Sequence, residues 1–267
     1  MSTPTEVHLT NHLKQKMLRG EVASSMTVRL VQGIEIVQVA KTAGFDSLYV
    51  DMEHSTFSIE ATSQICIAAL HLGITPLVRV PANTPEYISR VLDGGAMGII
   101  APHVRSADDA KAVVQAAKFP PFGGRSAIGG LPHLQYRSIP AITANPILNQ
   151  STFVAVMMET LEALDNVEEI AAVDGVDMLL IGTNDLTAEM GIPGDYDNSK
   201  VSVAYERTLK ACISNGKQVG VGGLASRPDL IAHYVSKGCR YVSMGHDLGF
   251  LLATCQAKAK WVSELKV

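Results

Sequence analysis

Three ionisable residues, Asp51, Glu53 and His54, directly follow the apolar run at 48–50. Such side chains beside a buried strand cost free energy unless they are paired or used in chemistry. Of the three, His54 suits proton transfer, because imidazole changes its charge near neutral pH. A carboxylate that orients the imidazole raises its basicity, and Asp93, at the end of a predicted helix, is our candidate for that partner. The commoner alternative for a lone histidine is a purely structural role.

Two further carboxylates, Glu159 and Asp185, come directly after two successive predicted strands. Adjacent strands lie about 4.8 Å apart, so the two side chains can converge on one point. Their mutual repulsion would be relieved by a cation between them. Two carboxylates and open positions suit Mg2+ or Mn2+, with Co2+ or Zn2+ as further options. The alternative is that each carboxylate caps the helix that follows it.

Arg79 interrupts the apolar segment "LVRVP" at 77–81 with a charge that cannot be neutralised. If its side chain points into an active site, it needs an anionic partner, and a substrate oxyanion would serve. The alternative is a structural ion pair with a nearby acid.

Eight apolar runs, most of them separated by segments of helical periodicity, must position these residues. We predict strands over 23–31, 47–52, 76–80, 97–101, 153–158, 178–181, 219–222 and 241–244. Several are apolar throughout, as is typical of parallel strands that are buried on both faces. Helix signals lie between them, with Ser106 as a predicted N-cap and Gly73 and Gly238 as predicted helix ends. This alternation predicts an α/β fold, a (β/α)8 TIM barrel formed by 1–267 as a single domain, with its active site at the carboxyl ends of the strands.

Composition excludes several classes of function. The chain is 47% hydrophobic, carries a net charge of -4 and has no Lys/Arg cluster, which disfavours nucleic acid as a partner. No apolar stretch of signal-peptide or membrane-spanning length occurs, so we expect a cytoplasmic protein without membrane association. The four scattered cysteines include no CxxC pair and are expected to be reduced.

Two segments have no assigned place in the predicted barrel. The segment 119–149 is too long for a simple connection, and we expect it to lie over the barrel mouth. The stretch 247–265 predicts a helix with an unusually apolar first half. It either packs as the eighth helix on its own barrel or packs on a neighbouring subunit.

Several motifs, taken together in order and spacing, resemble the HpcH/HpaI aldolase family of metal-dependent class II pyruvate aldolases. The resemblance extends from about residue 11 to 260. The motifs are "VDMEH" (50–54), "LVRVP" (77–81), "RVLDGGAMGIIAPHV" (90–104), "FPPFGGR" (119–125), "METLEALDNVEEIAAVDGVDMLLIGTNDL" (158–186) and "SMGHDLG" (243–249).

The resemblance implies a role for each matching position. Glu159 and Asp185 match the metal ligands, and Arg79 matches the arginine that steadies the keto oxygen and the enolate. His54 and Asp93 match a catalytic dyad. The loop residues Gly182 and Thr183 match those whose backbone N–H groups hold the pyruvate carboxylate, and Asp51 matches an acidic position close to the dyad.

This chain departs from the family pattern at positions whose side chains shape the substrate pocket. Met157 stands where the family often has a pocket-lining Gln, and Arg29 lies beside the position of a strand-one aromatic residue. We therefore expect Arg29, Met157, Arg125 and the loop 129–138 to decide which aldehyde is used.

The resemblance implies an enzyme that reversibly cleaves a 4-hydroxy-2-oxoacid into pyruvate and an aldehyde by way of a pyruvate enolate. It also implies a homo-oligomer, a hexamer built as a trimer of dimers, with the final helix swapped between subunits. An oxaloacetate decarboxylase remains an alternative, because it forms the same enolate. A lyase that acts on CoA thioesters is a further alternative, but it would need a basic region to bind the CoA phosphates, and none is evident in this sequence. A non-catalytic small-molecule-binding barrel would not need the five catalytic-type residues.

Overall fold

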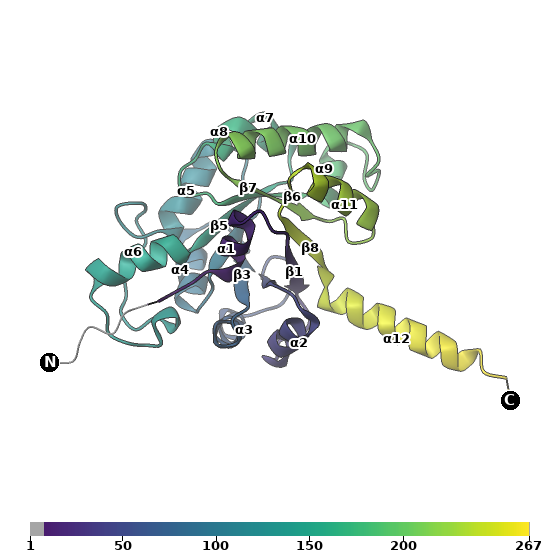
Figure 1. Ribbon diagram of the computed structural model, residues 1–267, viewed down its shortest axis with the longest axis horizontal. Helices are drawn as coiled ribbons and strands as arrows, with labels where there is room; N and C mark the ends of the chain where they lie inside the picture. Colours follow the sequence, from purple (N-terminus) through teal and green to yellow (C-terminus); the bar gives the residue numbers. More distant parts are fainter. Residues whose placement is uncertain (1–7, 267) are drawn as a thin grey trace.

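The structure, a computed structural model, describes residues 8–266 and contains eight parallel strands that close into a barrel in the order β1 to β8. The strands are β1 Ala23–Val28, β2 Ser47–Asp51, β3 Thr75–Arg79, β4 Gly98–Ala101, β5 Phe153–Met158, β6 Met178–Gly182, β7 Gln218–Gly222 and β8 Tyr241–His246. The barrel closes where β8 pairs with β1, with Tyr241 opposite Ala23. The predicted (β/α)8 TIM barrel is confirmed (Figure 1), although β1 ends at Val28 instead of residue 31.

Helices connect the strands and surround most of the barrel (Figure 1). They are α1 His12–Leu18, α2 Glu35–Ala43, α3 Ile59–Leu72, α4 Pro85–Asp93, α5 Ala107–Ala117, α6 Ala141–Ser151, α7 Leu161–Asp165, α8 Val167–Ala171, α9 Thr183–Glu189, α10 Ser199–Ser214, α11 Pro228–Lys237 and α12 Asp247–Ser263. The expected N-cap is confirmed, since the Ser106 hydroxyl accepts from the backbone N–H of Asp109. The expected end of α3 is confirmed as well, because Gly73 adopts a φ of 64° in the left-handed region.

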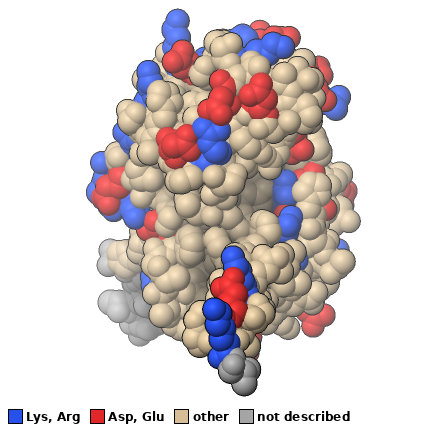
Figure 2. Space-filling view, turned by 90° about the vertical axis from the view of Figure 1, so that its right-hand side faces the viewer, with Lys and Arg blue, Asp and Glu red and all other residues tan. Residues whose placement is uncertain are grey.

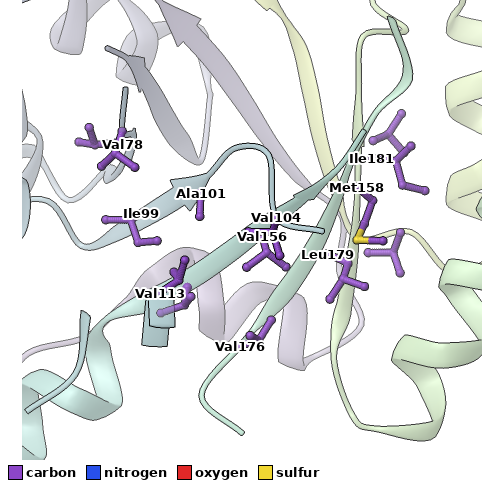
Figure 3. Close-up of a cluster of buried hydrophobic side chains, with 14 of the residues drawn as sticks. Val78, Ile99, Ala101, Val104, Val113, Val156, Met158, Val176, Leu179 and Ile181 are labelled. Carbon is purple, nitrogen blue, oxygen red and sulfur yellow. The ribbon is translucent and has the colours of Figure 1, made fainter. Parts of the chain in front are cut away.

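The apolar residues form two layers, one inside the barrel and one between strands and helices. The inner layer includes Tyr49, Leu77, Phe153, Leu180 and Tyr241, together with Leu13 and Met17 of α1. In the outer layer, valines and isoleucines of β3 to β6 belong to one cluster with residues of α5, which packs on β5, for example Val113 near Val156 (Figure 3). The N–H of Leu13 also donates to the hydroxyl of Thr75 at the start of β3. Helix α1 therefore closes the end of the barrel at which the strands begin, which leaves the opposite end for a site.

The segment 119–149 lies at that amino end of the strands, so the expectation that it covers the mouth is wrong. The ammonium group of Lys118 donates to the carbonyl of Asn149 at 2.7 Å, and Asn11, just before α1, donates to the carbonyl of Ser151 at 2.9 Å. His133 contacts the carbonyl of Ala96, just ahead of β4, at 2.9 Å. The reason is directional: a helix between two parallel strands returns the chain to the start of the next strand, and this segment follows α5.

Helix α12 extends away from its own barrel, as Figure 1 shows. Its first residue, Asp247, is buried, but every residue from 250 to 266 is exposed. The exposed residues include large apolar side chains, namely Leu251, Leu252, Trp261 and Val262. Packing as the eighth helix on its own barrel, one of the two expected alternatives, is therefore not the arrangement that the structure has.

Candidate active site

A cavity of about 420 Å³ opens at the carboxyl ends of the strands. Six of the residues expected in the site line it: Arg29, Asp51, His54, Arg79, Met157 and Asp185. They come from five different strands or the turns after them, which is why no short stretch of sequence contains the site. The cavity lies at the end of the barrel opposite α1, where a TIM barrel carries its chemistry.

Arg79 is held rigidly on the wall of this cavity by two carboxylates. Its Nε and Nη2 atoms donate to the two oxygens of Asp51 at 2.9 and 2.6 Å, and its Nη1 lies 2.8 Å from Oε2 of Glu53. Burial alone would raise the pKa of Asp51, but the hydrogen bonds from Arg79 outweigh it and lower that pKa. Burial likewise opposes the charge of Arg79, and the bonds to Asp51 raise the pKa of the guanidinium beyond its ordinary value. The structural ion pair foreseen for Arg79 is present, and Glu53 is part of it together with Asp51.

His54 stands at the mouth of the cavity with an exposed imidazole. Its Nε2 is 3.9 Å from Oε2 of Glu53, and its backbone N–H donates to Asp51. The candidate partner, Asp93, is the last residue of α4 and binds Arg125 at 2.6 Å. Because α4 starts at the carboxyl ends of the strands and runs back, Asp93 and Arg125 lie at the amino end. The structure therefore does not bring His54 and Asp93 of one chain together, and it does not place Arg125 in the cavity of its own chain.

Glu159 lies at the end of β5, with its carboxylate almost fully shielded from solvent. The backbone N–H of His103 donates to its Oε1 at 2.7 Å, and the Nδ1 of His103 is 3.0 Å from the same oxygen. Burial raises the pKa of Glu159; His103 opposes this effect, and the charges of Asp185 and Glu53 add to it. Asp185 lies in the first turn of α9 and lines the cavity, so the two carboxylates are close enough to influence each other.

His103 is a site residue that sequence reasoning missed. Its Nε2 lies 2.7 Å from Oε1 of Glu53, so the ring bridges Glu53 and Glu159. Its backbone adopts a φ of 54°, a conformation that is uncommon for residues other than glycine. The available signal was its position two residues after β4, in "APHV", where a polar side chain at a strand end carries weight.

Gly182 and Thr183 form the junction between β6 and α9. A Cβ atom on Gly182 would approach both the Glu159 side chain and the Met157 methyl group to 3.1 Å, so the position leaves little room for a side chain. The Thr183 hydroxyl donates to the carbonyl of Gly222 at 2.6 Å and contacts Tyr205 at 2.8 Å. Only the backbone of Thr183 is thus available to a ligand.

A family model described as HpcH/HpaI aldolase/citrate lyase matches residues 31–253. The chain belongs to this family. A 4-hydroxy-4-methyl-2-oxoglutarate aldolase from Hapsidospora irregularis is 43% identical over 80% of this chain and 80% of its own length. An enzyme of the same name from Chaetomium globosum is 41% identical over 82% of each chain. The crystal structure of an HpcH/HpaI aldolase from Desulfitobacterium hafniense matches with a TM-score of 0.91 at 27% identity, over 97% of this chain and 98% of that one.

As a member of the HpcH/HpaI family with aldolases as relatives, the chain is an aldolase, a carbon–carbon lyase. The decarboxylase alternative is not favoured, and a non-catalytic barrel is excluded. Within residues 8–266, no helix has the length and apolar character needed to cross a membrane.

Aldolases of the HpcH/HpaI family depend on a divalent metal, and the site fits one. A shielded carboxylate with a raised pKa beside a second carboxylate, as in Glu159 and Asp185, is an arrangement that a cation stabilises. Within the described residues, no group of three or more His, Cys, Asp or Glu side chains is arranged to hold a metal. Two oxygen donors and open positions for substrate and water suit a hard cation rather than a closed structural zinc site.

Proposed function

We propose that this aldolase reversibly cleaves a 4-hydroxy-2-oxoacid into pyruvate and an aldehyde or related carbonyl compound. The observation that carries the proposal is the immobilised guanidinium of Arg79 on the cavity wall. Of its five N–H groups, three are taken by Asp51 and Glu53. A fourth, on Nη1, contacts Sδ of Met157 at 4.0 Å, and the fifth, on Nη2, remains available to an oxygen on which negative charge develops, which is the requirement for stabilising an enolate.

Glu159 and Asp185 are the residues that would hold the divalent metal, for which we propose Mg2+ or Mn2+, with Co2+ or Zn2+ as substitutes. When bound, the metal supplies a Lewis acid for the charge that develops on the substrate's 2-oxo oxygen. Arg79 donates a hydrogen bond to the same oxygen. The backbone N–H groups at Gly182 and Thr183 bind the carboxylate of the pyruvate half, as the family resemblance implies.

The bond changes follow from these positions. His54 accepts the proton of the C4 hydroxyl, the C3–C4 bond breaks, and its electron pair forms the enolate of pyruvate. The C4 oxygen becomes the carbonyl of the second product, and protonation of the enolate at C3 gives pyruvate. General base catalysis by a positioned histidine typically contributes about 10²- to 10⁴-fold.

The position of Asp93 leads us to propose that it acts on a neighbouring copy. His54 and Asp93 lie at opposite ends of one barrel, yet the side chain of His54 is 59% exposed and that of Asp93 is 36% exposed. An oligomer that apposes these two ends would let Asp93 of one chain orient His54 of the next. We propose the homohexamer implied by the resemblance as that oligomer.

Helix α12 supports this assembly. It carries exposed Leu251, Leu252 and Trp261, and the surface around its base is mostly uncharged on the face that Figure 2 shows. Packing α12 on a second barrel would bury these side chains, at about 25 cal/mol per Å² of apolar surface. Sedimentation analysis tests the proposal, which requires a species larger than a monomer.

Proton exchange tests the activity directly. With Mg2+ or Mn2+ present, the enzyme should exchange the C3 protons of pyruvate for deuterium, as observed by NMR, and EDTA should stop the exchange. A panel of aldehydes added with pyruvate should then give aldol products, identified by mass. Absence of exchange with all four metals would refute an enolate-forming function.

A further inference from the structure

Arg29 and His246, on one wall of the cavity, form a contact that a neutral imidazole cannot satisfy. The Nδ1 of His246 accepts from the backbone N–H of Gly249 at 2.9 Å, as the N-cap of α12, and its Nε2 is 3.1 Å from Nη2 of Arg29. A backbone N–H and a guanidinium are donors only, so both ring nitrogens would have to accept. A neutral imidazole has one acceptor nitrogen and a protonated imidazole has none.

Keeping the N-cap hydrogen bond places the ring proton on Nε2, where it faces the guanidinium of Arg29. Burial and then the charge of Arg29 lower the pKa of His246, which favours the neutral ring. Among the residues that the structure describes, Arg29 forms no ion pair with a carboxylate. Two donor groups that converge in this way are completed by an anionic oxygen between them.

The arrangement is built into the fold by Asp247. Its Oδ1 accepts from the backbone N–H groups of Arg29 at 3.1 Å and Leu248 at 2.9 Å. Its Oδ2 accepts from Leu30 and Val31 at 2.9 and 2.8 Å. The carboxylate, only 5% exposed, thus fixes the chain just after β1. Because its oxygens are occupied by four backbone groups, it holds Arg29 in place without pairing with its guanidinium.

Arg29 and Arg79 line the same cavity from two sides of β2. Arg29 follows Val28, which pairs with Val50, and Arg79 pairs with the next residue, Asp51. The backbones of β1 and β3 are therefore about two strand spacings apart, roughly 10 Å. Side chains that reach inward shorten this gap, so one ligand with an anionic group at each end can contact both arginines.

Building on the proposed function, we propose that Arg29 and His246 bind a carboxylate on the carbonyl half of the substrate. The chain would then cleave a 4-hydroxy-2-oxo diacid in which C4 carries the second carboxylate, and its carbonyl product would itself be an oxoacid. The 2-oxoacid end of that substrate lies toward Arg79, and the second carboxylate accepts from Arg29 Nη2 and from Nε2–H of His246.

Two uncleavable ligands of equal length test this subsite without turnover. 2-Oxoglutarate has the five-carbon diacid skeleton but no C4 hydroxyl, and 2-oxopentanoate replaces its far carboxylate with a methyl group. By calorimetry with Mg2+ present, we expect the wild-type enzyme to bind 2-oxoglutarate about 10- to 100-fold more tightly, as a charge-assisted hydrogen-bond pair provides. Arg29→Gln should abolish this preference. His246→Asn, which keeps an N-cap acceptor, should reduce it.

The matched control is Arg19→Gln, which removes the same charge from an exposed position at the end of α1. It should keep the preference for 2-oxoglutarate. An equal loss in Arg19→Gln, or an unchanged preference in Arg29→Gln or His246→Asn, would overturn the subsite. Pyruvate C3 exchange by the wild-type enzyme separates the two hypotheses: exchange without the preference refutes only this inference, and absence of exchange refutes the proposed function.

Discussion

Asp51 and Arg79 stand directly opposite each other on β2 and β3, and their side chains join through two hydrogen bonds of 2.9 and 2.6 Å. Glu53 binds the remaining nitrogen of the guanidinium at 2.8 Å. The plane of the guanidinium is therefore fixed before any substrate arrives. A fixed donor needs no reorganisation when charge develops on the substrate, and electrostatic catalysis depends on that property.

Arg79→Lys should abolish most of the activity although it keeps the positive charge. An ammonium group cannot make the paired contacts with Asp51 and Glu53 and still point an N–H group at a substrate oxygen. We expect kcat to fall about 10²- to 10³-fold, the loss typical of removing one oxyanion donor. Pyruvate C3 proton exchange measures this step without the aldehyde. Arg105→Lys, at an exposed position, is the control, and exchange at the wild-type rate in Arg79→Lys would contradict the assignment.

Glu159→Gln should raise the melting temperature of the metal-free protein and abolish its response to Mn2+. The substitution removes a buried charge that Asp185 and Glu53 further disfavour. A gain of about 1 kcal/mol corresponds to roughly 2–4 °C for a domain approaching this size. In the wild-type protein, Mn2+ at 100 times its Kd should add about 2.7 kcal/mol of stability. Thermal unfolding measures both effects.

Glu162→Gln is the matched control, because Glu162 is 60% exposed and only three residues away. It should leave the melting temperature and the Mn2+ response unchanged. A full Mn2+ response in Glu159→Gln would place the metal elsewhere.

The barrel could be predicted because most of its strands are continuous apolar runs, which are typical of parallel strands buried on both faces. The segment 178–181, for example, is apolar at every position, and the structure places it as β6 inside a closed sheet. Because the active site of a TIM barrel lies at the carboxyl ends of its strands, the predicted strands also placed Asp51, Arg79 and Asp185 near it, and all three line the cavity. These predictions succeeded because the spacing of apolar residues, the burial of a strand and the direction of the chain all depend on residues that are close in sequence.

The features that the sequence did not predict involve residues whose positions depend on distant parts of the chain. Pairing His54 with Asp93 within one chain ignored the return direction of α4, which places Asp93 at the amino end of the strands. His103 was missed because nothing near it predicts its positive φ or its contact with Glu159. The pattern of α12 is the same whether it packs on its own barrel or on another, so sequence alone left both alternatives open.

His133 should make the fold less stable as the pH falls from about 6.5 to about 4. Burial lowers its pKa to about 4, and its Nδ1 is shielded from solvent without a partner. In this interval the unfolded chain binds the proton and the folded chain does not, so the free energy of unfolding decreases as the pH falls. Allowing for partial exposure of the residue, we expect a loss on the order of 2 kcal/mol.

Urea unfolding at pH 6.5, 5.5 and 4.5 measures this loss. His133→Gln keeps a donor for the carbonyl of Ala96 and should flatten the pH dependence, whereas His71→Gln, at an exposed site, should leave it as in the wild type. A wild-type slope in His133→Gln would assign the effect to other groups.

Asp93 and His54 provide a test for a site shared between chains. Purified His54→Gln and Asp93→Asn proteins should each be nearly inactive, since each lacks one member of the proposed dyad. If Asp93 acts on a neighbour, mixed oligomers contain some sites with His54 from one chain and Asp93 from the other. With random mixing of equal amounts in a symmetric oligomer, roughly one quarter of the wild-type activity should return.

The recovered activity separates catalysis from structure, because Asp93 also binds the buried Arg125. Weakening that ion pair lowers the stability of the Asp93→Asn chain, but it cannot make mixing restore turnover. Mixing His54→Gln with His54→Asn is the control, because no arrangement of these chains contains His54. Native mass spectrometry should confirm that the chains have exchanged. Mixed oligomers without recovered activity would show that Asp93 does not complete the site of a neighbouring chain.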